Sequence, residues 1–311
     1  MPLQVNFKPL LVILGPTAVG KTEISIKLAE RLNGEIVSAD SRLFYRGMDI
    51  GTAKPSLSER SRVPHHLIDV VDPDQNWSLA TFQRAAYDAI EDIHNRDHLP
   101  FFVGGTGQYI QAVVEGWDIP EVEPNPGLRV ALEQWAKQIG SQGLHDRLKV
   151  LDPVAASRID HQNLRRTVRA LEVILHSGKP FSSQQKKTGA RYKTLLLGIN
   201  RPRPELYARI DARIQNMLDA GFIHEVRSLL AVGFSPDLPA FSAIGYRQII
   251  SYIRGEISLD EAIVLMKRYT RQYVRRQANW FKLEDPEICW FQAGVEIVNE
   301  IEKTIRSFLD S

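Results

Sequence analysis

Eight consecutive residues near the start of the chain have the types and spacing of a phosphate-binding loop. Gly15-Pro-Thr-Ala-Val-Gly-Lys-Thr22 follows the apolar run Leu10–Leu14 and precedes a helix expected from about Lys21 to Arg31. Such a loop points several backbone N–H groups at one anion, and the helix N-terminus adds positive potential. An ordinary glycine-rich turn is the alternative. The residues predicted to bind the phosphate are Gly15, Thr17, Ala18, Val19, Gly20, Lys21 and Thr22, with Thr22 also reaching Mg²⁺.

The acidic residue that usually completes the metal site of such a loop is missing from its expected place. The strand expected at Phe101–Val103 ends in Gly104-Gly-Thr-Gly107, without Asp or Glu. Asp40, just past another expected strand, is the acidic candidate instead. The alternative is that Asp40 only caps a helix or forms a turn.

The elements that must position these residues alternate between strand and helix. Because ligands of open α/β sheets bind beyond the carboxyl ends of the strands, the polar residues there should surround one crevice. The residues expected around it are Thr17, Asp40, Ser41, Thr106 and Gly107. The expected strands are Leu10–Leu14, Glu35–Ser38, His66–Val71 and Phe101–Val103.

A helical insertion is predicted in the middle of the chain. Proline and acidic residues are enriched between Trp117 and Arg129, as in a linker, and helices are expected from Asp152-Pro153 and over about Gln162–His176. The run Thr194–Ile199 is strand-like and returns to the sheet. The expected fold is α/β: a P-loop NTPase-like parallel sheet flanked by helices, formed by residues 1–125 and 192–311, with an inserted all-helical domain at 126–191 and a helical C-terminal region.

A basic helix is predicted in that C-terminal region. Ser258-Leu-Asp-Glu261 is a capping box, and Lys267, Arg271 and Arg275 share one helix face at four-residue spacing. Tyr269, Tyr273 and Trp280 are interleaved with them. A basic stripe with aromatic residues suits phosphate contact and base stacking on RNA. The alternative is a solvated face whose aromatic residues pack on the core.

Composition suits an ordinary soluble enzyme, and the cytoplasm is the expected compartment. The 311 residues are 43% hydrophobic, the net charge is +2, and Cys289 is the single cysteine. Neither a signal peptide nor an apolar run long enough to span a bilayer is found, so no membrane association is expected. One cysteine excludes an internal disulfide framework and a multi-cysteine zinc site. No long hydrophobic heptad pattern argues for an oligomer, so a monomer is expected.

Several further motifs, in order along nearly the whole chain, resemble the bacterial tRNA dimethylallyltransferase (tRNA isopentenyltransferase) family. The resemblance rests on Gly15–Thr22, Asp40-Ser41 with Tyr45, Met48-Asp-Ile-Gly-Thr-Ala-Lys54, Pro64-His-His-Leu-Ile-Asp69, Gly104-Gly-Thr106 and Ala243-Ile-Gly-Tyr-Arg247. It implies transfer of a dimethylallyl group from dimethylallyl diphosphate to the exocyclic amine of the adenosine 3′ to the anticodon, in tRNAs reading codons that start with U. The loop would then hold a diphosphate leaving group, with Mg²⁺ as cofactor.

The resemblance also implies roles for particular residues. Asp40 would be the general base, Thr106 would orient the reacting amine, and Arg213 is the candidate arginine for the diphosphate, with a surface arginine as the alternative. The inserted helices would clasp the tRNA anticodon stem-loop. Many relatives carry glutamine where this chain has Leu43, which leaves the role of that residue open. The residues expected to contact tRNA are Asp40, Ser41, Arg42, Leu43, Thr106, Arg129, Asn163, Leu164, Arg165, Arg166, Thr167, Ser242, Ala243, Ile244, Gly245, Tyr246, Arg247, Arg271 and Arg275.

Three other functions remain open on the sequence. A phosphate loop most often means ATP or GTP binding, so a nucleotide or metabolite kinase is the first, although it should have the missing acid. A transferase that prenylates free adenylate is the second, but it would not need the insertion or the basic helix. A non-catalytic RNA-binding module is the third, and it predicts that Asp40→Ala changes nothing.

Overall fold

The computed structural model describes residues 7–120, 122, 124–184 and 189–311. The chain divides into two units. Unit 1 is Met1–Val114 with Ala190–Ser311, and unit 2 is Glu115–Gly189. Each unit has its own cluster of buried apolar side chains.

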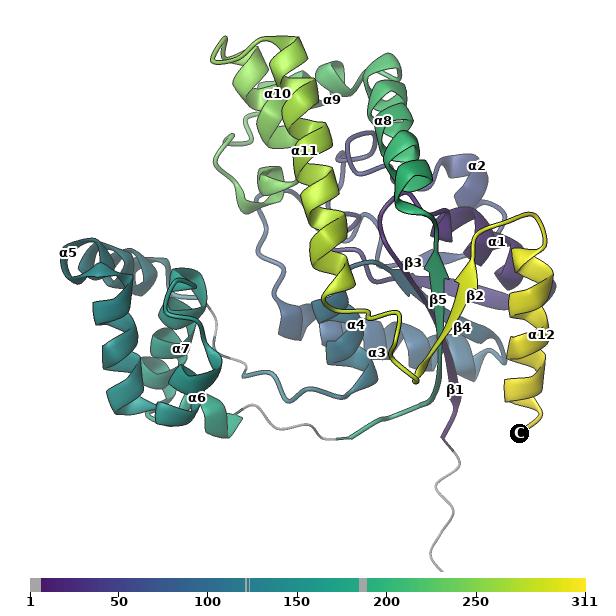
Figure 1. The fold of residues 1–311 in the computed structure, drawn as a ribbon, viewed down its shortest axis with the longest axis horizontal. Coiled ribbons are helices and arrows are strands. Elements are labelled where there is room, and N and C mark those ends of the chain that lie inside the picture. The colour runs from purple at the N-terminus through teal and green to yellow at the C-terminus, as the bar shows by residue number, and fades with distance from the viewer. Residues whose placement is uncertain (1–6, 121, 123, 185–188) are drawn as a thin grey trace, which may run out of the picture. The chain divides into compact units, whose positions relative to one another are not determined.

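Unit 1 is built on one six-stranded sheet, drawn in Figure 1. All the strand pairs are parallel, and the order across the sheet is β3-β2-β4-β1-β5-β6. The central strands are almost wholly apolar and buried, as expected for a parallel sheet covered on both faces. The strands are β1 (Pro9–Leu14), β2 (Gly34–Ser38), β3 (His65–His66), β4 (Leu99–Gly104), β5 (Lys193–Asn200) and β6 (Ile288–Gln292).

The expected strand His66–Val71 is wrong over most of its length. β3 ends at His66, because Leu67 and Asp69 have φ angles of 60° and 57°, which a strand does not accommodate. Val71 makes only an isolated bridge with Tyr45. Strand β6, a short strand that pairs with β5, was not predicted from the sequence.

The register of the sheet brings three strand ends together. Leu14 at the end of β1 pairs with Gly104 of β4, and Ser38 at the end of β2 pairs with Val103. The segments that follow these strands are the phosphate loop, the segment around Asp40 and the segment around Thr106. They therefore leave the sheet side by side at its carboxyl edge.

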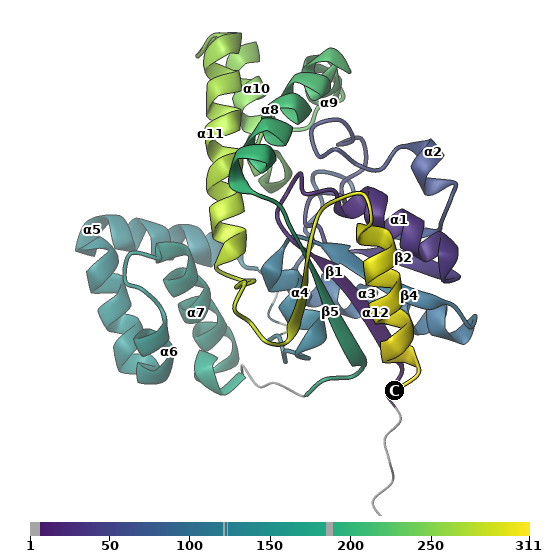
Figure 2. The ribbon, with the colours of Figure 1, turned by 45° about the vertical axis from the view of Figure 1, so that its right-hand side comes forward.

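Helices flank the sheet, and four of them form a group beyond the carboxyl ends of the strands. Helix α1 packs against α12 on one side of the sheet and α3 against α4 on the other (Figure 2). The group beyond the strand ends is α8–α11 (Figure 1). The helices of unit 1 are α1 (Lys21–Arg31), α2 (Leu57–Arg60), α3 (Leu79–Asn95), α4 (Gly107–Val114), α8 (Arg203–Asp219), α9 (Phe222–Ala231), α10 (Tyr246–Ile253), α11 (Leu259–Ala278) and α12 (Ile297–Leu309), with a 3₁₀ turn, η2, at Pro239–Ser242.

Unit 2 is helical and begins before the expected residue 126. It contains α5 (Pro126–Leu151), α6 (Pro153–Arg158), α7 (Leu164–Ser177) and the 3₁₀ turn η1 (Phe181–Gln184), and α5 is interrupted at Gly140, where φ is 80°. The preceding segment belongs to this unit because Val122 packs on its core and Asn125 N–H donates to Glu172. Asp152 caps α6, and α7 ends at the left-handed Gly178.

No helix in the described part of the chain is both long and apolar enough to cross a membrane.

Candidate active site

The phosphate loop between β1 and α1 depends on left-handed backbone. Gly15 and Gly20 have φ angles of 147° and 112°, and Ala18 adopts 64°. A Cβ atom on Gly15 would lie 2.4 Å from the carbonyl oxygen of Ile199 in β5, so glycine is required by close approach as well as by φ. The loop is thus pressed against the neighbouring strand before it turns into α1.

Lys21 lies in the concave side of this loop. Its Nζ donates to the carbonyl oxygens of Gly15 and Pro16, both at 2.9 Å. Burial lowers the Lys21 pKa from its ordinary value of 10.5 to about 8; the charge of Asp40 opposes this shift and that of Arg213 adds to it. One anionic and two cationic side chains therefore meet at the loop, and the excess positive charge suits an anionic ligand.

The structure places Arg213, the candidate arginine, at the site. It projects from α8 and its Nη2 donates to the Thr52 carbonyl oxygen at 3.1 Å. Burial lowers its pKa and the Asp40 carboxylate opposes that shift, as expected for a guanidinium inside the site rather than on the surface. The side chain is half-buried and its guanidinium is bound to the Thr52 backbone, unlike that of a freely solvated surface arginine.

A second arginine of the same helix was missed. Arg209 lies one helical turn before Arg213 and donates from Nε to the Ala18 carbonyl oxygen at 2.8 Å. The four-residue spacing in Arg209-Ile-Asp-Ala-Arg213 was a usable signal, since it places both side chains on one helix face.

Asp40 both forms a turn and lies in the candidate site. Its Oδ1 accepts a hydrogen bond from the backbone N–H of Arg42 at 2.9 Å, which is the turn-forming contact of the alternative reading. Its charge also acts on Lys21, Arg213 and Tyr273, so the carboxylate lies among the groups around the loop. Local geometry and a chemical role are compatible here, because one carboxylate oxygen makes the turn and the other is left for a substrate.

Thr106 lies beside the Asp40 segment and opposite the basic helix. Its Oγ1 accepts from the backbone N–H of Ser41 at 3.4 Å and lies near the Tyr273 hydroxyl. Burial raises the Tyr273 pKa, and the Asp40 charge raises it further. Glycine is needed just after Thr106, because a Cβ on Gly107 would lie 2.2 Å from the Trp280 ring. Tyr273 and Trp280 therefore contact the site loops.

Two segments expected to contact tRNA are joined by Arg42. Its guanidinium donates to the carbonyl oxygens of Pro239 and Ala240 and to Ser242 Oγ, at 3.1 to 3.3 Å. Residues 40–43 and 242–247 therefore lie together. Within the second segment Ser242 and Arg247 are exposed.

Some side chains in the expected tRNA-binding set are buried. Tyr246 is 0% exposed and donates to Glu225, and Ala243 is 5% exposed; Gly245 is buried beside Phe222. Side-chain contact with RNA from these positions is therefore not possible in this structure. Ile244 and Leu43 are half-buried.

The basic face of α11 is partly neutralised. Arg271 donates twice to the Asp211 carboxylate of α8 at 2.8 Å, and Lys267 Nζ lies 3.6 Å from the same carboxylate. Arg275 is exposed. The stripe predicted from spacing exists, but Arg271 and Lys267 pair with Asp211 of α8, which neither prediction foresaw, while Arg275 remains at the surface.

Unit 2 carries the remaining expected tRNA contacts. Arg129 forms an ion pair with the buried carboxylate of Glu172 at 2.8 Å, and Asn163 caps α7. Leu164 packs on the core of the unit, and Thr167 is fully buried, so its side chain cannot reach RNA. Arg165 and Arg166 are exposed on the first turn of α7.

The site suits Mg²⁺ only when a bound phosphate supplies further oxygen ligands. Among the described residues, no group of three or more His, Cys, Asp or Glu side chains is arranged to hold a metal ion. Mg²⁺ in phosphate sites is held by one or two protein oxygens together with substrate phosphates. The exposed Thr22 at the start of α1 and the Asp40 carboxylate supply oxygens of that kind.

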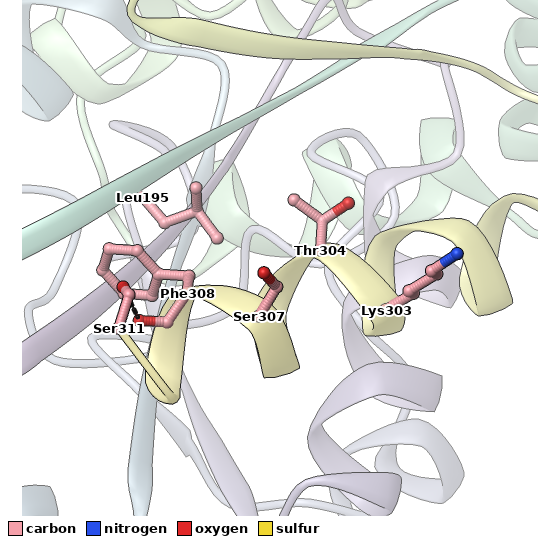
Figure 3. A pocket seen from close by; sticks show the side chains of 6 residues that line it. All are labelled: Leu195, Lys303, Thr304, Ser307, Phe308 and Ser311. Atoms are coloured by element: carbon pink, nitrogen blue, oxygen red, sulfur yellow. Dashed lines mark hydrogen bonds between the residues drawn. The ribbon is translucent and has the colours of Figure 1, made fainter.

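A hollow elsewhere in unit 1 has none of this chemistry. It lies between the start of β5 and α12, where Leu195, Phe308 and Ser311 line it together with Lys303, Thr304 and Ser307 (Figure 3). The Ser311 hydroxyl donates a hydrogen bond to the Phe308 carbonyl oxygen at 2.9 Å. This hollow is at the amino end of β5, away from the phosphate loop.

Fold and site together define a P-loop α/β protein with an anion site and a helical insertion. The chain matches the family model described as IPP transferase over residues 43–284. It is 53% identical to a tRNA dimethylallyltransferase of Roseiflexus sp. (strain RS-1), covering 97% of this chain and 99% of the relative, and 49% identical to one of Thermomicrobium roseum, covering 97% and 93%.

Solved structures agree with these matches. A full-length tRNA isopentenylpyrophosphate transferase from Bacillus halodurans has a TM-score of 0.73 at 40% identity, covering 97% of each chain. A eukaryotic dimethylallyltransferase described as acting on tRNA has a TM-score of 0.80 at 29% identity, covering 96% of this chain and 77% of the other. The chain belongs to the IPP transferase family of tRNA dimethylallyltransferases.

Proposed function

We propose that this protein transfers a dimethylallyl group from dimethylallyl diphosphate to the exocyclic amine of the adenosine 3′ to the anticodon in tRNAs reading codons that start with U. The single observation that carries the proposal is the convergence of Lys21, Arg213 and Asp40 at the phosphate loop. Two cations suit a departing diphosphate, and one carboxylate suits removal of a proton from an amine. The protein acts in the cytoplasm as a monomer.

The reaction follows from the placement of these groups. The allylic carbon–oxygen bond to the diphosphate breaks while the amine nitrogen forms a bond to that carbon, and Asp40 accepts the proton that the nitrogen loses. The charge that develops on the diphosphate is met by loop N–H groups, Lys21 and Arg213. Mg²⁺, held by Thr22 and the phosphate oxygens, would supply further charge neutralisation.

The adenine must leave its stack to reach this chemistry. Extruding a base costs less from a loop than from a duplex, which suits an anticodon loop as substrate. Thr106 lies beside the Asp40 segment, through the Ser41 N–H, and is positioned to orient the amine. Exposed Ser242, Arg247 and Arg275 of unit 1, and Arg165 and Arg166 of unit 2, are proposed to contact the RNA.

The test combines Mg²⁺ and radiolabelled dimethylallyl diphosphate with either unmodified tRNA or free AMP, and follows ATP hydrolysis in parallel. We expect label in tRNA, reduced at least about 100-fold in kcat by Asp40→Asn, because general-base catalysis contributes about 10² to 10⁴. Exposed Asp74→Asn is the matched control. Label only in AMP, or ATP turnover without label transfer, would refute the proposal.

Measurements of label transfer from dimethylallyl diphosphate and of tRNA binding separate the transferase from a non-catalytic RNA-binding module. Asp40→Asn should bind tRNA at least as tightly as wild type, because the substitution keeps the shape of the side chain and removes its negative charge together with its basicity. If wild-type protein bound tRNA but transferred no label, the RNA-binding module would be the better description.

A further inference from the structure

One buried side chain joins the phosphate loop to the glycine-rich loop after β4. Gln277, in the last turn of α11, is 4% exposed. Its Oε1 accepts from the backbone N–H of Thr17 at 3.0 Å, and its Nε2 donates to the Gly105 carbonyl oxygen at 2.8 Å. Both ends of the amide are therefore engaged, one on each loop.

The surroundings leave Gln277 little room to move. A Cβ atom placed on Gly105 would lie 2.3 Å from Gln277 Nε2, 3.1 Å from the Gly15 carbonyl oxygen and 3.5 Å from Lys21 Nζ. The amide, the start of the phosphate loop and the loop cation thus converge on one glycine. Tyr273, one turn earlier on α11, lies near Thr106 of the same glycine-rich loop.

This contact changes the set of donors that the loop can offer an anion. Phosphate loops bind by pointing successive backbone N–H groups at phosphate oxygens. The Thr17 N–H is engaged by Gln277, whereas the N–H groups at the start of α1 and the third hydrogen of Lys21 Nζ, whose other two bond the Gly15 and Pro16 carbonyl oxygens, remain. A loop with fewer backbone N–H donors near its start suits a shorter phosphate chain.

We propose that Gln277 is a positioning residue that makes this loop select a diphosphate over a triphosphate, by withdrawing the Thr17 N–H from the anion and locking the front of the loop against Gly105. The inference rests on the proposed function, in which the loop holds a diphosphate leaving group. It explains how a loop sequence that usually binds nucleoside triphosphates is adapted to a prenyl diphosphate.

The test measures binding of inorganic diphosphate and inorganic triphosphate, each with Mg²⁺, by calorimetry. The variants are Gln277→Met, which keeps the size of the side chain and removes both hydrogen bonds, and Gly105→Ala, whose methyl group displaces the amide. The matched control is Gln215→Met, exposed on α8. Circular dichroism establishes that each variant is folded, and Gly105→Ala carries the test if Gln277→Met does not fold.

We expect wild type to prefer diphosphate, and the ratio of the two affinities to fall about tenfold in either variant, as loss of one or two hydrogen bonds predicts. Gln215→Met keeps the wild-type ratio. If Gln277 were merely structural, its loss would weaken the binding of diphosphate and triphosphate equally. An unchanged ratio of the two affinities in a folded variant therefore overturns the proposal. A wild type without preference overturns it as well.

The two proposals fail in different experiments. The ratio of anion affinities decides the role of Gln277, and label transfer to tRNA by wild-type protein decides the proposed function. A wild type that transfers label while Gln277→Met keeps the diphosphate preference would leave the function standing and refute the inference.

Discussion

The ammonium of Lys21 is the group whose charge state decides how well the loop holds an anion. Burial brings its pKa down to about 8, although the neighbouring Asp40 carboxylate opposes this. The protonated form dominates below pH 8 and offers a full charge to the diphosphate. Above pH 8 the free protein increasingly holds a neutral amine, which attracts the diphosphate far less.

We therefore predict that kcat/KM for dimethylallyl diphosphate falls above pH 8, by up to about tenfold per pH unit. The pH profile of initial rates at low donor concentration measures it. Lys21→Arg keeps its charge across this range, because an arginine side chain stays protonated, so its residual activity should not fall above pH 8. A wild-type profile that is flat to pH 10 would contradict the assignment.

At the scale of elements, the Met48–Lys54 loop holds Arg213 in place. The Glu225 carboxylate of α9 accepts the backbone N–H groups of residues 49, 50 and 51, at 2.9, 2.6 and 3.1 Å, and the Tyr246 hydroxyl at 2.6 Å. The next residue, Thr52, provides the carbonyl oxygen that Arg213 contacts. A carboxylate outside the site thereby sets the position of an arginine inside it.

Glu225→Gln should lower the free energy of unfolding by about 1 to 3 kcal/mol, because hydrogen bonds to a charged group are lost. It should also raise the KM for the donor, since the Thr52 carbonyl is no longer held against Arg213. Urea unfolding and donor titration measure the two effects. Glu256→Gln, at an exposed pair on another loop, is the control. Lowered stability with an unchanged KM would show that the loop does not position Arg213.

Helix α11 carries one basic residue that is paired within the protein and another that is exposed to solvent. Arg271 contacts Asp211 and lies over the Tyr207 ring, with its guanidinium carbon 5.1 Å from the ring centroid, whereas Arg275 is exposed. Arg271→Ala should lower the free energy of unfolding by about 1 kcal/mol. Arg275→Ala should leave stability unchanged.

The two variants should also differ in the salt dependence of tRNA binding. Loss of one phosphate contact in Arg275→Ala reduces the slope of log affinity against log salt concentration by about 0.7 to 0.9. The slope for Arg271→Ala should match that of wild type. The reverse pattern in a filter-binding titration would mean that Arg271 releases Asp211 when RNA binds.

At the scale of the whole molecule, the two units have separate cores and their own polar interiors. In unit 2 the fully buried Glu172 carboxylate pairs with Arg129 and Arg169 and accepts the Asn125 N–H. Burial would raise its pKa, but these partners outweigh burial and lower it. These contacts lie within residues 115–189.

We predict that a fragment of residues 115–189 folds alone and unfolds cooperatively on heating, as followed by far-ultraviolet circular dichroism. Glu172→Gln should lower its stability by about 2 kcal/mol, since two half-exposed guanidinium groups lose their partner. Exposed Glu133→Gln serves as the control. A fragment that shows no cooperative transition would mean that unit 2 needs unit 1 to fold.

The sequence predicted local structure correctly where the signal lies within a single helix, strand or loop. The loop Gly15–Thr22 with the helix after it, the capping box at Ser258 and the helix predicted over about Gln162–His176 all depend on residues within a few positions of one another. The strand after His66 was misjudged, because the left-handed residues Leu67 and Asp69 have no glycine to announce them.

The site itself was predicted in part. Lys21, Asp40 and Thr106 lie together because the order of β2, β4 and β1 brings their strand ends together, and Arg213 reaches the same loop from α8. Neither Gln277 nor Arg209 was foreseen as a contact of the loop. Both contact the loop across about 190 to 260 positions of sequence, a range over which residue spacing carries no information.

The order of amino acids alone therefore establishes the phosphate loop, the alternation of strand and helix, and the family whose motifs the chain carries. The tertiary structure decides which charges remain available. Asp211 neutralises Arg271, Glu172 holds Arg129, and Gln277 takes the Thr17 N–H. The physical reason is that the free energy of a charge or an N–H group depends on the partners that packing brings to it, and these partners come from distant parts of the chain.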